Sequence, residues 1–361
     1  MTNDPISVVI AGGGTAGHIE PALAVAEALK SRHGARVTAL GTERGLERDI
    51  IPARGVELRL ITPVPIPRKP SGDLGKLPFK LTKAVREARK VLKEVKADAV
   101  FGTGGYVAAP AYLAAKSMGL PFYVLETNAL AGMANKLGVR IGGVGLNATA
   151  GSGIPGEVVG IPVRSSLTKV SEGQKENARI SWGLGKDRPL ILVTGGSQGA
   201  QSINRAIAGA LPELTRSYQV LHAYGKKNAV PEPAENYVAV PYIEDMASAL
   251  ALADLVICRS GAMTVAEVSA AGVPAIYIPL PIGNGEQALN CQELVEHGAA
   301  VLIPDGMLTP ELLAKTVAEI LEDDTYYQSM ANAVESSSAG DVAELLADRI
   351  ATRISDAKDG K

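Results

Sequence analysis

The sequence predicts an α/β protein built from two Rossmann-like, doubly wound domains that face each other across a cleft. Short apolar runs alternate with amphipathic stretches along almost all of the 361 residues, and continuous apolar strands are typical of parallel sheets covered by helices on both faces. The series also begins twice in the same way, because residues 8–18 and 191–200 each read as a strand, a glycine turn and a helix start. A ligand of such a protein binds outside the carboxyl ends of the strands, between the domains.

Eight apolar runs are the expected strands. They cover residues 6–11, 37–40, 99–101 and 122–125 in the first half, and 190–194, 219–223, 255–258 and 275–279 in the second. Helical patterns lie between them. The stretch 145–174 is rich in Gly, Ser and Pro, which indicates a linker, with residues 160–164 as the hinge.

We therefore expect an N-terminal domain over residues 1–163 and a C-terminal domain over residues 164–340. The tail, residues 341–361, has apolar residues at helical spacing and predicts an amphipathic helix, but the pattern does not say which domain it covers. These apolar residues are Val342, Leu345, Leu346, Ile350 and Ile354.

Composition excludes several classes of protein. With 38 acidic and 36 basic residues the formal charge is −2, so the global charge gives no reason to expect nucleic acid as a partner. The two cysteines, Cys258 and Cys291, lack the spacing of a metal site and indicate a reducing compartment. The N-terminus has no signal-peptide pattern, and the most apolar region, residues 261–282, is interrupted by charge and proline, unlike a transmembrane helix.

The first glycine turn allows two interpretations. Gly12, Gly14 and Gly17 match G-x-G-x-x-G, which favours a nicotinamide-dependent enzyme, but the strand 37–40 does not end in the acid that binds the adenosine ribose. The other interpretation is that backbone amides at a helix N-terminus favour an anionic ligand or developing negative charge. His18 lies at the start of this helix, which disfavours the imidazolium form and makes a neutral ring available as a general base; a purely structural histidine is the alternative.

The second glycine turn, residues 195–199, has no G-K-[ST] and is therefore not a nucleoside triphosphate loop. Ser197 adds a hydroxyl to its backbone amides. No Asp-x-Asp occurs in the chain, so we expect no metal. A bound diphosphate would then be stabilised by helix termini, hydroxyls and Arg164 or Arg259.

Two further positions suit a nucleotide sugar. Glu267 follows a strand and a polar turn, where a carboxylate can accept hydrogen bonds from two vicinal ribose hydroxyls, although the helix dipole alone also favours an acid there. The amides of Gln287 and Asn290, at a loop-to-helix start, suit sugar hydroxyls and serve equally well as helix caps.

One segment of the first half is strongly basic. Between Arg68 and Lys96, ten Lys and Arg residues against three Asp and Glu residues give a net charge of +7. Apolar residues at helical spacing between residues 81 and 95 predict a helix whose apolar stripe faces the core. Apolar residues also lie beside the bases, in the stretches 61–67 and 77–79, and such a combination attracts an anionic membrane surface. A solvated helix face is the alternative.

Six motifs, taken together and in order, resemble the MurG family of UDP-N-acetylglucosamine transferases, which convert lipid I to lipid II in peptidoglycan synthesis. They are residues 12–18, 102–106, 126–128, 160–164, 195–200 and 259–267. The resemblance implies a GT-B fold whose last helix returns to the N-terminal domain, and a metal-independent enzyme without a cofactor. It implies three partners: UDP-N-acetylglucosamine, the undecaprenyl-pyrophosphoryl-N-acetylmuramyl-peptide lipid I, and an anionic membrane surface. The implied location is peripheral, on the cytoplasmic face of the cell membrane.

The resemblance also implies site residues by their places in the motifs. The expected catalytic residues are His18 and Asn128. The expected substrate-binding residues are Thr15, Ala16, Gly17, Tyr106, Asn128, Arg164, Ser197, Ile243, Arg259, Ala262, Met263, Thr264, Val265, Ala266, Glu267 and Gln287. Among these, Ser197 faces the diphosphate, Ile243 contacts the uracil and Gln287 contacts the N-acetylglucosamine.

The sequence thus predicts an inverting glycosyltransferase in which the C4 hydroxyl of the N-acetylmuramyl unit attacks the anomeric carbon of the donor and UDP leaves from the opposite face. Ala16 and Thr127 depart from a glycine and a glutamine that are frequent in the family, without removing a needed charge. Two alternatives stay open. A UDP-sugar 2-epimerase of similar fold would not need a membrane-facing basic patch, and a non-catalytic UDP-sugar sensor would bind the donor without turnover.

Overall fold

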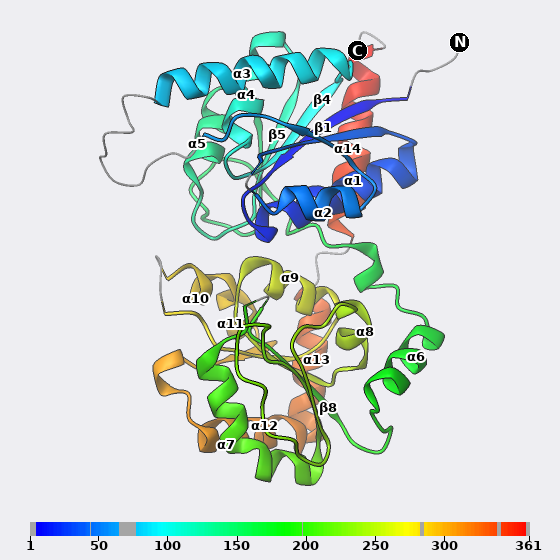
Figure 1. Cartoon of the computed structure of the whole chain (residues 1–361), viewed down its shortest axis with the longest axis vertical. Helices are drawn as coiled ribbons and strands as arrows, with labels where there is room; N and C mark the ends of the chain where they lie inside the picture. Colours follow the sequence, from blue (N-terminus) through cyan, green and yellow to red (C-terminus); the bar gives the residue numbers. More distant parts are fainter. Residues whose placement is uncertain are drawn as a thin grey trace. The chain divides into compact units, whose positions relative to one another are not determined.

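The computed structural model describes residues 5–43, 45–64, 77–196, 198–281, 285–337 and 341–358. The chain divides into two compact units, Met1–Arg164 with Asp341–Lys361, and Ser165–Gly340 (Figure 1). Each unit contains a parallel sheet with helices packed on it. The predicted α/β class and the two doubly wound sheets are confirmed.

The sheet of the first unit has the strand order β3-β2-β1-β4-β5-β6-β7, paired in parallel throughout the described residues. Its strands are β1 (Ser7–Gly12), β2 (Arg36–Gly41), β3 (Glu57–Leu60), β4 (Ala99–Gly104), β5 (Phe122–Glu126), β6 (Val144–Asn147) and β7 (Glu157–Val158). Its helices are α1 (Ala16–His33), α2 (Glu47–Ala53), α3 (Leu77–Glu94), α4 (Ala108–Met118), α5 (Met133–Arg140) and α14 (Val342–Lys358). The strand order reverses between β1 and β4, so their carboxyl ends are where a ligand is expected.

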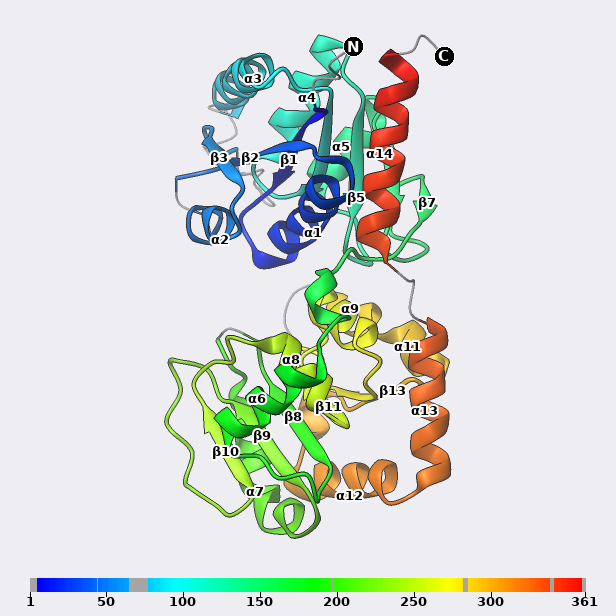
Figure 2. The ribbon, with the colours of Figure 1, turned by 90° about the vertical axis from the view of Figure 1, so that its right-hand side faces the viewer.

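Alternate residues of β1 face opposite layers of helices. Val8 and Ile10 lie in a core with α1 and α14, whereas Val9 and Ala11 lie in a core with α3 and α4. Figure 2 shows α3 and α14 on opposite sides of this sheet. Because both faces of β1 are covered, its sequence is a continuous apolar run, which is the pattern that predicted a parallel strand.

The last helix, α14, packs on α1. Leu346 is fully buried in the core that it shares with α1, and Arg32 of α1 lies 2.8 Å from both Glu344 and Asp348. Leu345, which the sequence places on the apolar stripe, is instead 47% exposed. It is adjacent to Leu346, and a helix turns by about 100° per residue, so its side chain points away from α1.

The apolar stripe of α3 faces the core, as predicted: Ala84, Ala88 and Leu92 are buried. The basic residues of the helix lie on other sides, and the exposed ones are Lys80, Lys83, Arg86, Lys90 and Lys93. Phe79, at the start of the helix, is 80% exposed. Ile66 and the predicted bases between residues 68 and 76 lie outside the described residues. Of the helices that the structure describes, none combines the length and apolar composition needed to cross a bilayer.

The sheet of the second unit has the order β10-β9-β8-β11-β12-β13, again parallel. Its strands are β8 (Leu190–Thr194), β9 (Gln219–Ala223), β10 (Tyr237–Val240), β11 (Leu255–Cys258), β12 (Ala275–Tyr277) and β13 (Ala300–Leu302). Its helices are α6 (Glu172–Trp182), α7 (Gln201–Ser217), α8 (Met246–Leu252), α9 (Ala262–Ala270), α10 (Glu286–Asn290), α11 (Gln292–Glu296), α12 (Pro310–Leu321) and α13 (Asp324–Ser337). The helices α7 and α12 share one core with β8 and β11.

The eight predicted strands are all present, although the run 275–279 ends as a strand at Tyr277. The sequence analysis missed β3, β6, β7, β10 and β13, which lie toward the sheet edges. Edge strands have less cover; β3, for example, is a charged and mostly exposed strand without a continuous apolar run. The predicted linker 145–174 is also too long, because it contains most of β6, all of β7 and the start of α6.

Candidate active site

The carboxyl end of β1 forms a glycine turn that leads directly into α1. Gly13 and Gly14 make the turn, and Gly14 has a φ of 88°, a left-handed conformation that favours glycine. Thr15 is the N-cap of α1; it and Ala16 are exposed, and Gly17 is half-buried. The backbone N–H groups at this helix start favour a negatively charged ligand.

His18 is half-buried in the first turn of α1. Its ring lies against the end of β4, since a Cβ on Gly104 would be 2.9 Å from the ring carbon Cε1. The Oγ1 of Thr103 donates to the His18 carbonyl oxygen at 2.5 Å, while Nδ1 is buried with no hydrogen-bond partner among the described residues. Burial lowers the pKa of His18, and this outweighs the opposite effects of the Glu126 charge and the Thr103 backbone. The ring is therefore neutral at about neutral pH and can accept a proton.

Tyr106 follows the turn after β4 and is 48% exposed. Its ring lies beside the first glycine turn, because a Cβ on Gly14 would be 3.4 Å from the ring carbon Cε2. An exposed ring in this position can contact a ligand bound at the start of α1.

Glu126 is a residue of this edge to which the sequence analysis gave no role. It is the last residue of β5 and is fully buried. Its carboxylate accepts four hydrogen bonds, from the backbone N of Asn128 and of Gly132 and from Nδ2 of Asn135 at 2.9 Å each, and from Nδ2 of Asn128 at 3.2 Å. The sequence shows only that Glu126 is a carboxylate at the end of an apolar strand. Its hydrogen-bond partners can be identified only in the folded structure.

Glu126 also fixes the orientation of Asn128. Both nitrogen atoms of Asn128 donate to this carboxylate, which leaves Oδ1 and the second hydrogen of Nδ2 for a substrate contact. Thr127, which departs from the family pattern, is 2% exposed and its side chain is turned away from solvent. Arg164 is the remaining residue of the first unit that is expected to contact the substrate. It is half-buried, and the chain enters the second unit directly after it.

In the second unit the turn after β8 has a similar geometry. Gly196 and Gly199 have φ values of 82° and 70°, and the Gly199 N–H donates to the Gly196 carbonyl oxygen at 2.9 Å. A Cβ on Gly199 would overlap the carbonyl oxygen of Tyr224, so the turn is held against the loop after β9. The turn leads to the N-terminus of α7. Ser197 lies outside the described residues.

Arg259 does not have the surroundings expected of a diphosphate-binding residue. Its Nη1 donates to Asp305 at 2.6 Å and to the carbonyl oxygen of Ile278 at 3.0 Å, and its Nη2 donates to the Oγ of Ser202 at 2.9 Å. Burial alone would raise the pKa of Asp305, but hydrogen bonds from Ser202 and Arg259 hold it below its ordinary value. Both terminal nitrogens contact protein groups, so the guanidinium joins loops at the carboxyl end of the sheet, and a diphosphate contact of Arg259 stays a prediction.

The helix α9 begins after β11, with Gly261 as its N-cap. The half-buried residues of its first turns are Ala262, Met263, Thr264, Ala266 and Glu267. Val265 is 8% exposed, so its side chain faces the interior and a ligand contact would use its backbone. The run 262–267 thus presents a helix N-terminus and one carboxylate, and its contact with a nucleotide stays a prediction.

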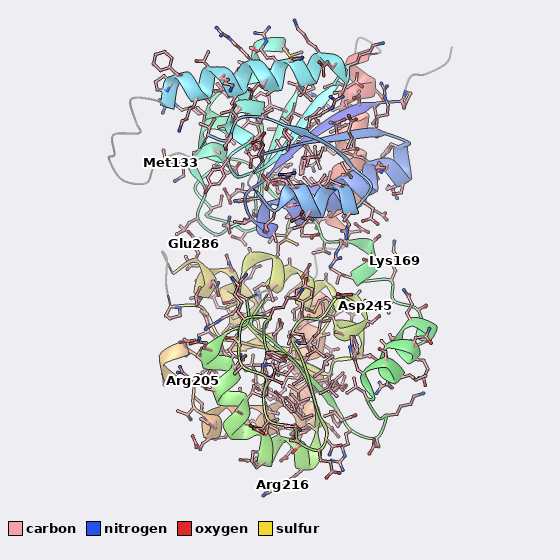
Figure 3. All side chains as sticks on the ribbon, in the orientation of Figure 1. Met133, Lys169, Arg205, Arg216, Asp245 and Glu286 are labelled. Carbon is pink, nitrogen blue, oxygen red and sulfur yellow. The ribbon has the colours of Figure 1, made fainter. Side chains whose placement is uncertain are left out.

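For Ile243 and Gln287, two other residues expected to contact the donor, the structure indicates which atoms are available for that contact. Ile243 is 2% exposed, so a uracil contact would use its backbone, in the loop between β10 and α8. That loop ends at Asp245 (Figure 3), which accepts from the backbone N of Ser248 at 3.1 Å and caps α8. The Oε1 of Gln287 accepts from the backbone N of Leu280 at 2.9 Å, so a sugar contact would use the amide nitrogen.

The described residues offer no arrangement for a metal ion or a reactive thiol. Within the ranges that the structure describes, no group of three or more His, Cys, Asp or Glu residues could hold a metal. Cys258 and Cys291 are buried, and burial raises the pKa of both thiols, which disfavours the thiolate.

The two sheets correspond to two known domain families. Residues 8–142 match the glycosyltransferase family 28 N-terminal domain, and residues 190–346 match the glycosyltransferase family 28 C-terminal domain. The fold and these matches define a GT-B glycosyltransferase.

Individual relatives narrow this class. A Corynebacterium efficiens protein named UDP-N-acetylglucosamine--N-acetylmuramyl-(pentapeptide) pyrophosphoryl-undecaprenol N-acetylglucosamine transferase is 59% identical over 97% of this chain and 98% of its own. The crystal structure of Acinetobacter baumannii MurG has a TM-score of 0.76 and 31% identity, covering 96% of this chain and 100% of that chain. The chain belongs to the MurG family. A UDP-GlcNAc 2-epimerase from Neisseria meningitidis, with a TM-score of 0.69 and 15% identity over 96% of this chain and 99% of its own, shares the fold alone.

Proposed function

We propose that the protein transfers N-acetylglucosamine from UDP-N-acetylglucosamine to the C4 hydroxyl of the N-acetylmuramyl unit of lipid I, giving lipid II. Membership of the MurG family supports this donor and acceptor. Group transfer is supported by the surroundings of His18. Its ring is half-buried and neutral at the start of α1, and its buried Nδ1 has no hydrogen-bond partner in the described part of the chain.

His18 acts as the general base in this proposal. The acceptor oxygen forms a bond to the anomeric carbon, its proton passes to His18, and the bond between that carbon and the diphosphate oxygen breaks. The configuration inverts and UDP leaves. Asn128, held by Glu126, orients the acceptor through Oδ1. Because burial lowers the pKa of His18, the ring is ready to accept the proton before the reaction begins.

The second unit binds the donor. Backbone N–H groups at the N-termini of α7 and α9 stabilise the leaving diphosphate, and Arg164 adds positive charge. Glu267 accepts hydrogen bonds from the ribose hydroxyls, and the amide nitrogen of Gln287 contacts the sugar. Arg259 keeps the loops around this site in place through Asp305.

The test of this function is incubation with UDP-N-acetylglucosamine and a soluble lipid I analogue. We expect UDP release and a disaccharide product, both dependent on the acceptor. Formation of the 2-epimer of the donor without acceptor would identify the epimerase alternative. Donor binding without turnover would identify the sensor alternative, and either result contradicts the proposal.

We further propose that α3 docks the protein on the anionic cytoplasmic face of the cell membrane. Its bases Lys80, Lys83, Arg86, Lys90 and Lys93 are exposed, and Phe79, at the start of the helix, is 80% exposed. Each base near an anionic surface contributes about 1 kcal/mol, so three or four together hold the protein reversibly. Binding should weaken as salt shortens the Debye length from about 10 Å at 0.1 M to about 3 Å at 1 M.

Vesicle co-sedimentation tests this docking. A charge-reversal variant of Lys80, Lys83, Arg86 and Lys90 should pellet less than the wild type with anionic vesicles at low salt. The matched control reverses four exposed bases of the second unit, Lys186, Arg216, Lys227 and Lys315. Equal pelleting of the two variants would contradict docking through α3.

A further inference from the structure

Glu47 is a buried carboxyl group that the proposed reaction does not use. It is the first residue of α2 and is 0% exposed. Its Oε1 accepts from the backbone N of Thr42 at 3.3 Å and from the Oγ1 of Thr42 at 3.2 Å. Its Oε2 is buried and has no hydrogen-bond partner among the described residues. A half-satisfied buried carboxyl group destabilises the fold, so its presence calls for another reason.

The position of Glu47 suggests that reason. A Cβ on Gly13 would lie 2.8 Å from Oε1, and a Cβ on Gly45 would overlap Oε2. On its other side, the Gly13 N–H donates to the Gly104 carbonyl oxygen at 3.4 Å, and a Cβ on Gly105 would overlap the Gly13 carbonyl oxygen. Gly13 is therefore held between the Glu47 carboxyl group and the turn after β4.

The residues proposed to act lie next to Gly13 and to the turn after β4 that Gly13 contacts. Thr15 and His18 follow Gly13 within five residues, and Tyr106 follows the turn after β4. We infer that Glu47 is a positioning residue for the transfer reaction, because its buried carboxyl group supports the glycine turn and so sets the place of His18. This inference rests on the proposed function.

Glu87 provides a matched control because it makes the same two contacts elsewhere. Its carboxylate accepts from the backbone N of Thr62 at 2.6 Å and from the Oγ1 of Thr62 at 3.2 Å. These bonds lie after β3, two strands away from β1 in the sheet order, and each uses a different carboxylate oxygen. A general effect of losing a carboxylate that binds a threonine would therefore show in both glutamates.

The experiment compares Glu47→Gln with Glu87→Gln in the full chain. For Glu47→Gln we expect kcat to fall at least ~10-fold with the KM for UDP-N-acetylglucosamine within ~2-fold, since a small displacement of a catalytic group is costly. Hydrogen exchange of the backbone amides of residues 12–19 should become at least ~10-fold faster, because the turn opens more easily. Glu87→Gln should leave both quantities within ~2-fold of the wild type. If Glu47→Gln does not fold, Glu47→Asp, which withdraws the carboxyl group by one methylene, is tested in the same way.

Two results overturn the inference independently of the role of His18. One is an unchanged hydrogen-exchange rate of residues 12–19 in a folded Glu47 variant, and the other is equal changes of exchange rate and kcat in the Glu47 and Glu87 variants. Faster exchange with an unchanged kcat also overturns it, since Glu47 would then support the fold alone. In a His18→Ala background, Glu47→Gln should change kcat by less than ~2-fold if it acts through His18. Wild-type kcat in His18→Ala alone contradicts the proposed base, while the exchange measurement still tests the position of the turn.

Discussion

In both units an aspartate joins the amino ends of the two central strands by hydrogen bonds. Asp98, before β4, accepts from the backbone N of Ser7 at 2.8 Å, and its own N–H donates to the Ser7 carbonyl oxygen at 2.7 Å. Asp254, before β11, accepts from the backbone N of Leu190 at 2.7 Å and donates to the Leu190 carbonyl oxygen at 2.9 Å. In both units one aspartate therefore ties the start of the two central strands together.

At the carboxyl ends the units differ. The third residue of α1 is His18, half-buried and facing β4, whereas the third residue of α7 is Ile203, which is fully buried in the core. The same strand–turn–helix unit thus holds a titratable ring in one case and a packing residue in the other. The amino ends of the central strands are thus alike in the two units, whereas the carboxyl ends differ, and the proposed proton transfer uses the carboxyl end of the first unit.

Two histidines, His18 of the first unit and His222 of the second, show the same contrast. His222 has its Nδ1 2.7 Å from the hydroxyl of Tyr237 and its Nε2 3.0 Å from the Oδ1 of Asn204. The Nδ2 of Asn204 donates to the Tyr224 carbonyl oxygen at 2.9 Å, so Oδ1 faces the ring and Nε2 carries the proton. Burial lowers the pKa of His222 to about 4. Both ring nitrogens of His222 are thus bonded to protein groups, whereas Nδ1 of His18 has no hydrogen-bond partner among the described residues, as the proposed base requires.

The largest effect is expected from His18→Ala. Removing a general base lowers kcat by about 10²–10⁴-fold, while UDP affinity should stay within about 3-fold because the base faces the acceptor hydroxyl. If His18 is the base, the acidic limb of the kcat–pH profile of the wild type should lie below the ordinary histidine pKa of 6.5, because burial lowers the pKa of His18. Steady-state kinetics and UDP titration check both statements. A folded variant with wild-type kcat would place proton transfer elsewhere.

His222 should affect stability and leave kcat unchanged. Its pKa is about 4 in the folded protein and about 6.5 in the unfolded chain, so the unfolded state binds the proton first as pH falls. The free energy of unfolding should therefore decrease by about 3 kcal/mol between pH 6.5 and pH 4 from this residue, and His18 acts in the same direction. Urea unfolding at pH 7 and pH 4.5 should show a smaller pH dependence in His222→Gln. An equal dependence in both proteins would contradict the assignment.

Glu267→Gln should weaken UDP binding by at least about tenfold, because a carboxylate that accepts two hydroxyl hydrogen bonds stabilises the complex by more than about 1.4 kcal/mol. Calorimetry with UDP and with a 2′,3′-dideoxy analogue separates the ribose from the rest of the nucleotide. The wild type and the variant should bind the analogue alike. If they differ as much for the analogue as for UDP, the ribose contact is wrong.

The smallest effects are expected at the amino ends of the strands. Asp98→Asn and Asp254→Asn should each lower the free energy of unfolding by about 1 kcal/mol, since each weakens a charge-assisted hydrogen bond to a backbone N–H. Because burial raises the pKa of Asp254, the folded state binds this proton more tightly than the unfolded chain, so the contribution of Asp254 to the free energy of unfolding should increase as the pH falls through this pKa. Denaturant unfolding and kcat are the measurements. A large loss of kcat in either folded variant would contradict the view that the amino ends of these strands contribute to stability and not to the reaction.

The sequence was sufficient to predict the centre of each sheet, and the reason is burial. Strands such as β1 and β8 are covered on both faces and so contain a continuous apolar run. The edge strands β3 and β7 are short and exposed, and nothing local distinguishes them from loops. The register of Leu345 also escaped prediction, because adjacent leucines both fit an approximate apolar stripe.

The site could be predicted in part for a similar reason. The carboxyl ends of parallel strands meet at one edge, so motifs after β1, β4 and β5 bring His18, Tyr106 and Asn128 to the same edge. The contact of Arg259 with Asp305 could not be predicted, because a guanidinium after a strand suits a diphosphate as well as it suits a carboxylate that lies 46 residues further on. Glu126 and Glu47 escaped for the same reason, since a buried carboxylate is recognised by partners that local sequence does not show.

The return of α14 to the first unit has a consequence for how the chain is made. Leu346 and Ile350 complete the core against α1, yet some 300 residues separate α1 from α14 along the sequence. On the ribosome, the apolar side of α1 therefore stays uncovered while the whole second unit is synthesised, although domains generally fold from the N-terminus during synthesis. The first unit is synthesised before the second but completes its core after it. A nascent chain released before residue 342 therefore leaves the apolar side of α1 exposed.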